Sequence, residues 1–215
     1  DECLRETRTV GFRRVEWKPC EGAPDGAAPW LCVVNGEPVF LGGANWVPAR
    51  LAHLDATAED HDRLVGRYRD MGCTVLRVWG GAGLGDRSFY EACDRAGIFV
   101  WQEFPLSSSG IENTPPSDPE AIARLERIAV SYARRRANHP SLLLWCGGNE
   151  LYYGPSPDHP GPQKPVDLEH PCIAMLARVV TEEDPGRRFL TGSPSGPVDY
   201  ALPENYGKGI HHDIH

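Results

Sequence analysis

The chain has 215 residues and a formal net charge of −8, with 22 Lys and Arg against 30 Asp and Glu. This length can bury a hydrophobic core, and the acidic balance argues against a nucleic-acid partner, which requires clustered Lys and Arg. No apolar run approaches the roughly 18 residues of a membrane span, so neither a membrane segment nor a membrane partner is predicted. The start at Asp1-Glu2-Cys3 has no initiator Met and no signal sequence, so we expect the chain to be excised from a longer one.

The cysteines indicate a reducing compartment. There are seven of them, an odd number, and no pair has CxxC spacing. Cys73, Cys93 and Cys146 lie in or beside apolar segments, where a free cysteine behaves as a small hydrophobic residue. The sequence therefore predicts reduced thiols and a cytoplasmic location.

The first predicted elements form a β-hairpin. An apolar run at 30–34 leads into Asn35-Gly36, and a second run follows at 39–41. Asn-Gly between two β-rich runs is the strongest short-range hairpin signal. The Pro- and Gly-rich stretches 18–29 and 152–165 are predicted to be loops.

Helical patterns then alternate with short apolar runs. The predicted helices run from Thr57 to about Met71, from a cap at Asp86 to Gly97, from a capping box at Ser117–Glu120 to about Asn138, and over about 173–180. The predicted strands are 74–78, 98–101, 141–146 and 189–191. These strands are continuous apolar runs rather than alternating ones, which is typical of a parallel α/β sheet covered by helices.

This alternation allows two architectures, an open doubly wound sheet or a (β/α)8 barrel of the TIM type. No GxGxxG follows the first strand, and Gly80-Gly81-Ala82-Gly83 lacks that spacing, so no dinucleotide cofactor is predicted. Five strands over 39–191 correspond to about 35 residues per β/α unit, whereas eight units need roughly 250 residues. A barrel in this chain would therefore be truncated after about strand five.

Functional residues of parallel α/β folds lie just past the carboxyl ends of the strands. The residues near these positions include Asn45, Trp46, Arg77, Trp79, Trp101, Glu103, Asn149, Glu150 and Ser193. Glu150 follows a fully apolar strand, where a charge is costly unless it is used. A carboxyl group against aromatic rings would have a raised pKa suited to a general acid, and Asn149 beside it could bind a substrate hydroxyl. Alternatively, Asn149 and Glu150 only begin a helix.

The other candidates also have two interpretations. Arg77 could brace the barrel through a carboxylate, or it could hold a catalytic carboxylate ionised. Glu103 could be the second carboxylate of a glycosidase beside Glu150, or a structural partner of Arg77. The aromatic residues at strand ends could stack on sugar rings or pack in the core; they are Trp46, Trp79 and Trp101.

Two further side-chain groups suggest no chemistry. His211, His212, Asp213 and His215 match no standard zinc spacing, so no metal site is predicted. Ser193 and Ser195 lack a GxSxG elbow, which argues against a serine hydrolase.

Several segments together resemble the catalytic barrel of glycoside hydrolase family 2. They are Asn35–Pro48, Leu76–Gly81, Phe89–Ile98, Val100–Phe104 and His139–Glu150. Within the family, the combination is most similar to the β-mannosidase branch. Residues 9–13 resemble the last strand of the immunoglobulin-like sandwich that precedes such barrels. The resemblance implies that residues 1–29 end that sandwich and form a linker, and that residues 30–215 are the N-terminal part of the barrel.

The resemblance implies a retaining exo-glycosidase that hydrolyses terminal β-mannosides with two carboxyl groups. Glu150 matches the acid/base of the family, and Asn149 matches the residue that binds the 2-hydroxyl of the sugar. Arg77 matches the arginine beside the nucleophile, and Trp79 matches an aromatic contact of the terminal sugar. The nucleophile itself would follow strand seven, beyond residue 215, so the chain alone is expected to be inactive.

Other activities stay open at this point. The alternatives are a β-galactosidase or β-glucuronidase type of activity, or a barrel remnant that binds sugar or only contributes structure. A carbohydrate is the expected substrate. Unpaired edges of strands one and five would favour self-association of the truncated barrel.

Overall fold

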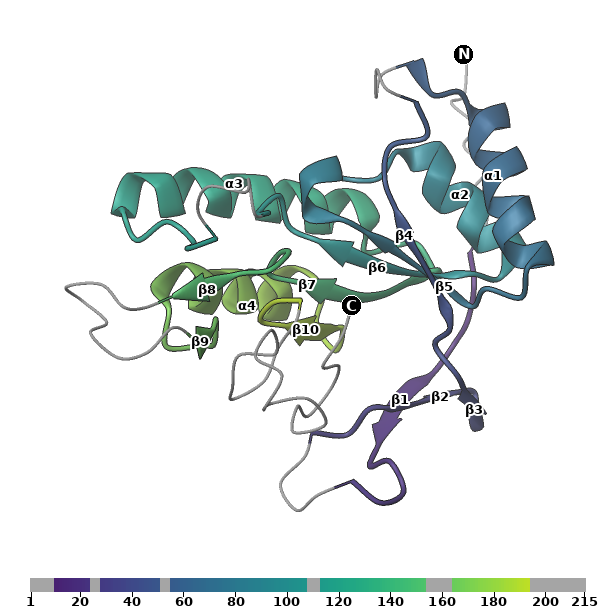
Figure 1. The fold of residues 1–215 in the computed structure, drawn as a ribbon, viewed down its shortest axis with the longest axis horizontal. Coiled ribbons are helices and arrows are strands. Elements are labelled where there is room, and N and C mark those ends of the chain that lie inside the picture. The colour runs from purple at the N-terminus through teal and green to yellow at the C-terminus, as the bar shows by residue number, and fades with distance from the viewer. Residues whose placement is uncertain (1–9, 24–27, 51–54, 108–112, 154–163, 194–215) are drawn as a thin grey trace, which may run out of the picture.

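The computed structural model describes residues 10–23, 28–50, 55–107, 113–153 and 164–193. They form a five-stranded parallel sheet covered by helices, a three-stranded antiparallel sheet and a two-stranded ribbon, β8 (Tyr152–Tyr153) with β9 (Lys164–Pro165). Figure 1 shows the parallel strands fanning out beside helices α1 to α4, with the antiparallel sheet set apart from the helices.

The parallel sheet has the strand order of a barrel. Its strands are β4 (Gly43–Trp46), β5 (Val75–Val78), β6 (Phe99–Glu103), β7 (Leu142–Cys146) and β10 (Arg188–Leu190). The helices between them are α1 (Ala58–Asp70), α2 (Arg87–Ala96), α3 (Pro119–Arg136) and α4 (Pro171–Glu183). Each of these strands pairs in parallel with the next, without the reversal of order that a doubly wound sheet requires. The prediction of a partial TIM-type barrel is confirmed.

The helices begin and end largely where the sequence predicts. At the start of α1, the Asp60 amide donates to Thr57 Oγ1 (3.2 Å) and the Thr57 amide donates back to Asp60 Oδ2 (3.1 Å). Helix α2 ends at Gly97, whose φ of 71° lies in the left-handed region. The expected capping box at Ser117 is replaced by a cap on Asp118, whose Oδ1 accepts from the Ala121 amide (2.8 Å).

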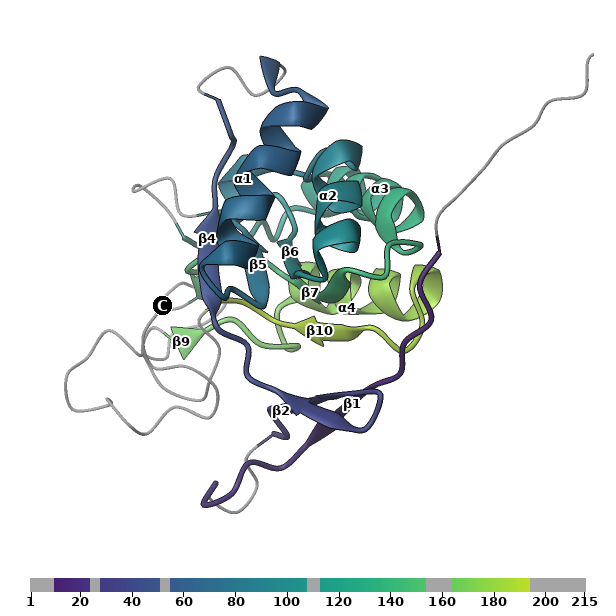
Figure 2. The same cartoon turned by 90° about the vertical axis from the view of Figure 1, so that its right-hand side faces the viewer.

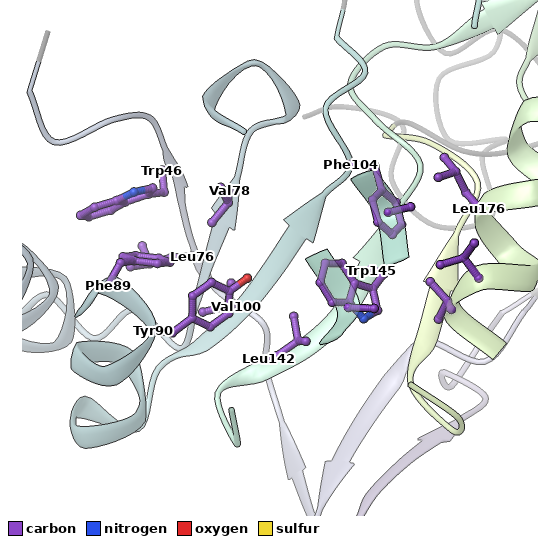
Figure 3. Close-up of a cluster of buried hydrophobic side chains, with 14 of the residues drawn as sticks. Trp46, Leu76, Val78, Phe89, Tyr90, Val100, Phe104, Leu142, Trp145 and Leu176 are labelled. Carbon is purple, nitrogen blue, oxygen red and sulfur yellow. The ribbon is translucent and has the colours of Figure 1, made fainter. Parts of the chain in front are cut away.

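The hydrophobic core lies between the parallel sheet and its helices. Helices α1 to α4 share one side of the sheet, and strands β1 and β2 lie on the other side (Figure 2). Figure 3 shows Leu142 and Trp145 of β7 among the side chains that fill this layer. The Trp145 ring stacks on Phe104 (centroids 5.2 Å apart), and its Nε1 donates to Asp184 Oδ2 (2.9 Å). Strand β7 is buried along its whole length, as its continuous apolar sequence predicts.

The first strand of the parallel sheet differs from the prediction. The apolar run at 39–41 predicts the strand there, but Phe40 is 88% exposed and the strand is Gly43–Trp46. A Cβ at Gly43 would lie only 1.7 Å from the Val75 carbonyl oxygen, so this pairing requires a residue without a side chain. Glycine and alanine have low β-propensity, which hides the strand in the sequence.

The antiparallel sheet contains the predicted hairpin and one strand that the sequence did not reveal. Its strands are β1 (Val15–Lys18), β2 (Leu31–Val34) and β3 (Glu37–Val39). Asn35 (φ 52°) and Gly36 (φ 93°) form the hairpin turn between β2 and β3. The strand expected at 9–13 is wrong for residues 10–13, since strand structure begins at Val15 and pairs with β2. The division into two domains at residue 29 stays a prediction.

The cysteines of the described residues are all free thiols. Cys32, Cys93, Cys146 and Cys172 are buried, as free cysteines in apolar surroundings commonly are. Within the same residues, no helix combines the length and the apolar character needed to cross a bilayer.

The close contact at Gly43 predicts a large stability cost for one added methyl group. We expect Gly43→Ala to lower the free energy of unfolding by about 1–3 kcal/mol, because the sheet must shift to admit the Cβ. Gly66→Ala is the matched control, since Gly66 lies inside α1 and an added Cβ there meets nothing within 4 Å. That variant should gain about 0.5–1 kcal/mol from helix propensity. Urea unfolding of both variants measures the difference, and equal effects would contradict the strand assignment.

Candidate active site

Arg77 connects four segments at the carboxyl end of the parallel sheet. Its Nε and Nη2 donate to Glu103 Oε1 on β6 (3.0 and 2.8 Å). Nη1 donates to Asn45 Oδ1 on β4 (2.9 Å), and Nη2 also donates to Asn149 Oδ1 after β7 (2.5 Å). Asn45 is the register partner of Arg77, and Glu103 lies two residues beyond the partner on β6. Because alternate strand residues share a face, these side chains meet on the face opposite the helices.

Glu103 is the buried anion of this network. Its side chain has no exposed surface, and its second oxygen, Oε2, accepts from the Gly80 amide (2.7 Å). Burial raises the pKa of Glu103, while the charge of Arg77 and the donated hydrogen bonds oppose that rise. A Cβ on Gly80 would lie 2.4 Å from the Leu106 carbonyl oxygen, so the approach of this amide to Glu103 depends on glycine.

Asn149 and Glu150 lie in a backbone ladder that continues past the ends of the strands. The Asn149 amide donates to the Leu106 carbonyl (2.9 Å), and the Ser193 amide donates to the Gly148 carbonyl (2.9 Å). The Glu150 amide in turn donates to the Ser193 carbonyl (2.6 Å). Glu150 is half-buried and has a φ of 51°, a left-handed conformation that is rare for a residue with a side chain. Such backbone strain is concentrated at functional sites.

The predicted aromatic residues have different positions. Trp79 follows β5 directly and precedes the short 3-10 turn Gly80–Ala82, and it is half-buried. Trp101 lies on the same face of the sheet as Arg77, and its ring stacks on Trp30 of the other sheet (centroids 6.4 Å apart). Trp46 is turned toward the helices, where its ring packs on Phe89 at 4.5 Å (Figure 3). In place of the predicted sugar contact, the structure gives Trp46 a packing role.

A cavity of about 910 Å³ lies between the face that carries Arg77 and the antiparallel sheet. This volume is within the usual range of small-molecule sites. Asn45, Arg77, Trp101 and Ser193 contribute to its lining, together with apolar side chains such as Leu31. Polar groups that converge in a largely apolar cavity can fix the orientation of a ligand.

The sequence places Ser193 and Asn45 at strand ends, but it assigns neither residue a role in a functional site. Ser193 is 1% exposed, and its hydroxyl oxygen has no hydrogen-bond partner in the described part of the chain. A buried hydroxyl without a partner costs roughly 1–3 kcal/mol. Its position on the cavity wall makes it a candidate contact for a ligand.

The structure provides no candidate metal centre among the residues it describes, where no three His, Cys, Asp or Glu side chains form a possible metal group. The C-terminal histidines at 211, 212 and 215 and Asp213 lie outside the described residues.

Comparisons with known proteins place this fold and its strand-end motifs in one family. Residues 85–160 match the family model described as glycosyl hydrolases family 2, TIM barrel domain. Beta-mannosidase of Mus musculus is 31% identical over 200 residues, which cover 89% of this chain and 22% of that protein. Beta-mannosidase B of Aspergillus fumigatus is 32% identical over 174 residues, covering 76% and 20%. The chain belongs to glycoside hydrolase family 2.

Solved structures carry the same fold as this chain. The crystal structure of beta-D-mannosidase from Dictyoglomus thermophilum matches with a TM-score of 0.71 and 30% identity, over 87% of this chain and 22% of that one. A Bacteroides uniformis beta-glucuronidase matches with a TM-score of 0.65 at 24% identity, covering 84% and 20%, which supports the fold alone. This family 2 chain thus spans about a fifth of the length of the relatives it matches.

The buried ion pair predicts a pH-dependent response to loss of Arg77. In Arg77→Met, burial of Glu103 is no longer opposed by the guanidinium, so the folded protein binds a proton there that the unfolded chain releases above its ordinary pKa. The loss of stability should therefore grow as the pH rises, from a small value near pH 5 to about 3–5 kcal/mol at pH 8.

A second arginine provides the control. Arg87 is exposed and pairs with Glu91 on the surface of α2 (2.7 Å). Arg87→Met should change the free energy of unfolding by less than about 1 kcal/mol at either pH. Urea unfolding at pH 5 and pH 8 measures both variants, and a pH-independent loss in Arg77→Met would contradict the buried pair.

Proposed function

We propose that this chain is the N-terminal part of the catalytic barrel of a retaining exo-β-mannosidase, and that Glu150 is its general acid/base. The observation that carries the proposal is the position of Asn149 and Glu150 directly after β7, with Asn149 bonded to the buried pair of Arg77 and Glu103. The β-mannosidases among the relatives, at about 30% identity over most of the chain, support this branch of the family.

In this proposal Glu150 protonates the leaving-group oxygen and later activates water. The hydrogen bond from its amide to the Ser193 carbonyl (2.6 Å) supports a fixed backbone at this residue. A carboxyl group held in one orientation transfers its proton more effectively than one that must first be ordered.

Asn149 binds the 2-hydroxyl of the terminal sugar in this proposal. Its Oδ1 accepts from Arg77, so its amide nitrogen is the group directed away from the guanidinium. The same orientation applies to Asn45, whose Oδ1 also accepts from Arg77. We infer that Glu103 acts by positioning Arg77, and that Asn45 and the hydroxyl of Ser193 add contacts to a sugar in the cavity.

The aromatic side chains complete the proposed substrate site. Trp79 is the expected contact of the terminal sugar, since an indole face suits the apolar face of a sugar ring. Trp101 lines the cavity, whose described lining does not include Trp79, and its stacking on Trp30 limits it to an edge of the substrate.

A retaining glycosidase needs a second carboxyl group about 5–5.5 Å from the first. Glu103 bonds Arg77 and Gly80 and is fully buried, which suits a positioning residue rather than a nucleophile. We therefore propose that the nucleophile belongs to a later strand of the complete barrel. A cytoplasmic location fits the free thiols, and self-association through the edges of β4 and β10 stays a prediction.

The assignment of Glu150 is tested in a protein that contains this chain and the remaining strands of the barrel. Glu150→Gln should lower the hydrolysis of unactivated β-mannosides by roughly 100- to 10,000-fold. Aryl mannosides with a very good leaving group need little protonation, so their glycosylation step should lose far less. Glu182→Gln, an exposed residue of α4, is the control and should leave both rates unchanged. Equal losses for the two kinds of substrate would exclude Glu150 as the acid.

The 215-residue chain alone should hydrolyse no β-mannoside, because one of the two carboxyl groups is expected outside it. Turnover is measured with an unactivated β-mannoside, whose hydrolysis depends on the acid, in parallel with the same preparation of Glu150→Gln. Turnover by the purified chain that disappears in Glu150→Gln would contradict this proposal, since contaminating enzyme would be present in both preparations.

A further inference from the structure

A second cavity lies at the opposite, amino-terminal end of the parallel sheet and is rich in arginine. It has a volume of about 320 Å³ and is lined by residues of three segments, 11–17, 137–143 and 184–188. Its lining includes Arg13, Arg187 and Arg188. The proposed function uses none of these residues.

Two of the guanidinium groups meet at one carbonyl oxygen. Arg13 Nη2 and Arg187 Nη1 both donate to the carbonyl of Leu142, the Arg187 bond being 2.5 Å long. Arg187 also donates to the carbonyl of Ala137 (2.9 Å) and to Asp184 Oδ2 (3.0 Å). Two like charges are thus held side by side in a partly buried place, which is unfavourable unless an anion is near.

The third guanidinium comes from the edge strand of the sheet. Arg188 packs against the rings of Trp17 and Trp30, 4.3 and 4.1 Å from their centroids. One of its nitrogens donates to the Pro29 carbonyl (2.6 Å). These contacts hold the Arg188 charge against two indole rings beside the cavity and add no negative charge to it.

The carboxylates nearby do not balance these cations. Within the described part of the chain, Asp184 is the carboxylate on the lining, and its Oδ2 also accepts from Trp145 Nε1 (2.9 Å). Asp94 lies behind the lining and is bonded to His139 (2.6 Å). Among the described residues of the lining, three are arginines and one is an aspartate, and the nearby charge of Asp94 also acts on Arg13. Burial and the proximity of Arg187 lower the pKa of Arg13 to about 10.

We propose that this cavity binds a small tetrahedral dianion of the phosphate or sulfate class. A dianion would neutralise the excess charge, and guanidinium groups match the oxygens of such anions with paired hydrogen bonds. Arg13 is the central contact, because it lies in the segment before β1 and its guanidinium donates to the carbonyl of Leu142 at the start of β7. A bound anion would therefore fasten this segment to the parallel sheet.

The experiment titrates inorganic phosphate into the full chain at constant ionic strength, with sodium chloride as the balancing salt. The melting temperature should rise with the logarithm of the phosphate concentration above the dissociation constant, by about 4 °C at ten times that constant. Sulfate should act alike, and acetate, a carboxylate monoanion, should not. Isothermal titration calorimetry should give one site per chain.

Two variants separate binding from general salt effects. Arg13→Gln should lose most of the phosphate-dependent shift. Arg134→Gln should keep it, because Arg134 lies on α3 and pairs with Glu183 outside the cavity (2.6 Å). Phosphate also stabilises proteins through exclusion from their surface, but that effect does not depend on a binding site and is equal in all variants. An equal shift in Arg13→Gln and Arg134→Gln, or none in the wild type, would overturn the proposal.

If Arg13→Gln does not fold, hydrogen exchange of the wild-type chain tests whether phosphate binds in this cavity. Phosphate should slow amide exchange in residues 137–143 and 184–188 and leave α1 unchanged. Uniform slowing, or slowing confined to other segments, would contradict binding in this cavity.

Discussion

The guanidinium of Arg77 bonds Glu103, Asn45 and Asn149, which come from different strands or strand ends. One planar group with five N–H donors can bind these acceptors together, which an ammonium group could not do in a fixed geometry. Burial of this charge is costly, and the carboxylate of Glu103 offsets that cost because its Oε1 accepts two bonds from Arg77 and its Oε2 accepts from the Gly80 amide. The same cation donates to the side-chain oxygens of Asn45 and Asn149, so the buried ion pair orients both amides, and that of Asn45 lies on the cavity wall.

The backbone supplies the second constraint on the site. Hydrogen bonds continue past the strands, from Asn149 to Leu106 on one side and from Ser193 to Gly148 on the other. Glu150 then bonds Ser193, so the segment after β7 is held from both neighbouring strand ends. A loop fixed in this way can hold Glu150 at a left-handed φ, whereas an isolated loop would relax to a more common conformation. Side-chain and backbone contacts therefore act on the same two residues, Asn149 and Glu150.

Much of this arrangement could be predicted from the sequence because its signals are local. A helix start is indicated by Thr57 with Asp60, a helix end by Gly97, and a buried strand by the apolar run of β7. An arginine in the apolar run of β5 indicates a buried partner for its charge. What could not be predicted depends on contacts between distant segments. Strand β4 begins at a glycine because the Val75 carbonyl lies against it, and the propensity of Gly43 itself argues against a strand. The misplaced strand also hid the orientation of Trp46, since the face of a strand residue follows from its register. The hydroxyl of Ser193, which has no hydrogen-bond partner among the described residues, has no sequence signature.

The two ends of the parallel sheet have opposite electrostatic arrangements. At the carboxyl end, one guanidinium is surrounded by acceptors. At the amino end, three guanidinium groups share a cavity with Asp184. Helix carboxyl termini lie at this amino end, and their carbonyl groups carry partial negative charge; the Ala137 carbonyl at the end of α3 accepts from Arg187 accordingly. Such carbonyls offset part of the charge of one cation but supply no full negative charge.

The bond of Arg187 to the end of α3 therefore explains the presence of Arg187 alone. Arg13 and Arg188 come from two other segments and form no ion pair with a carboxylate of the described residues, which an anion in this cavity would explain.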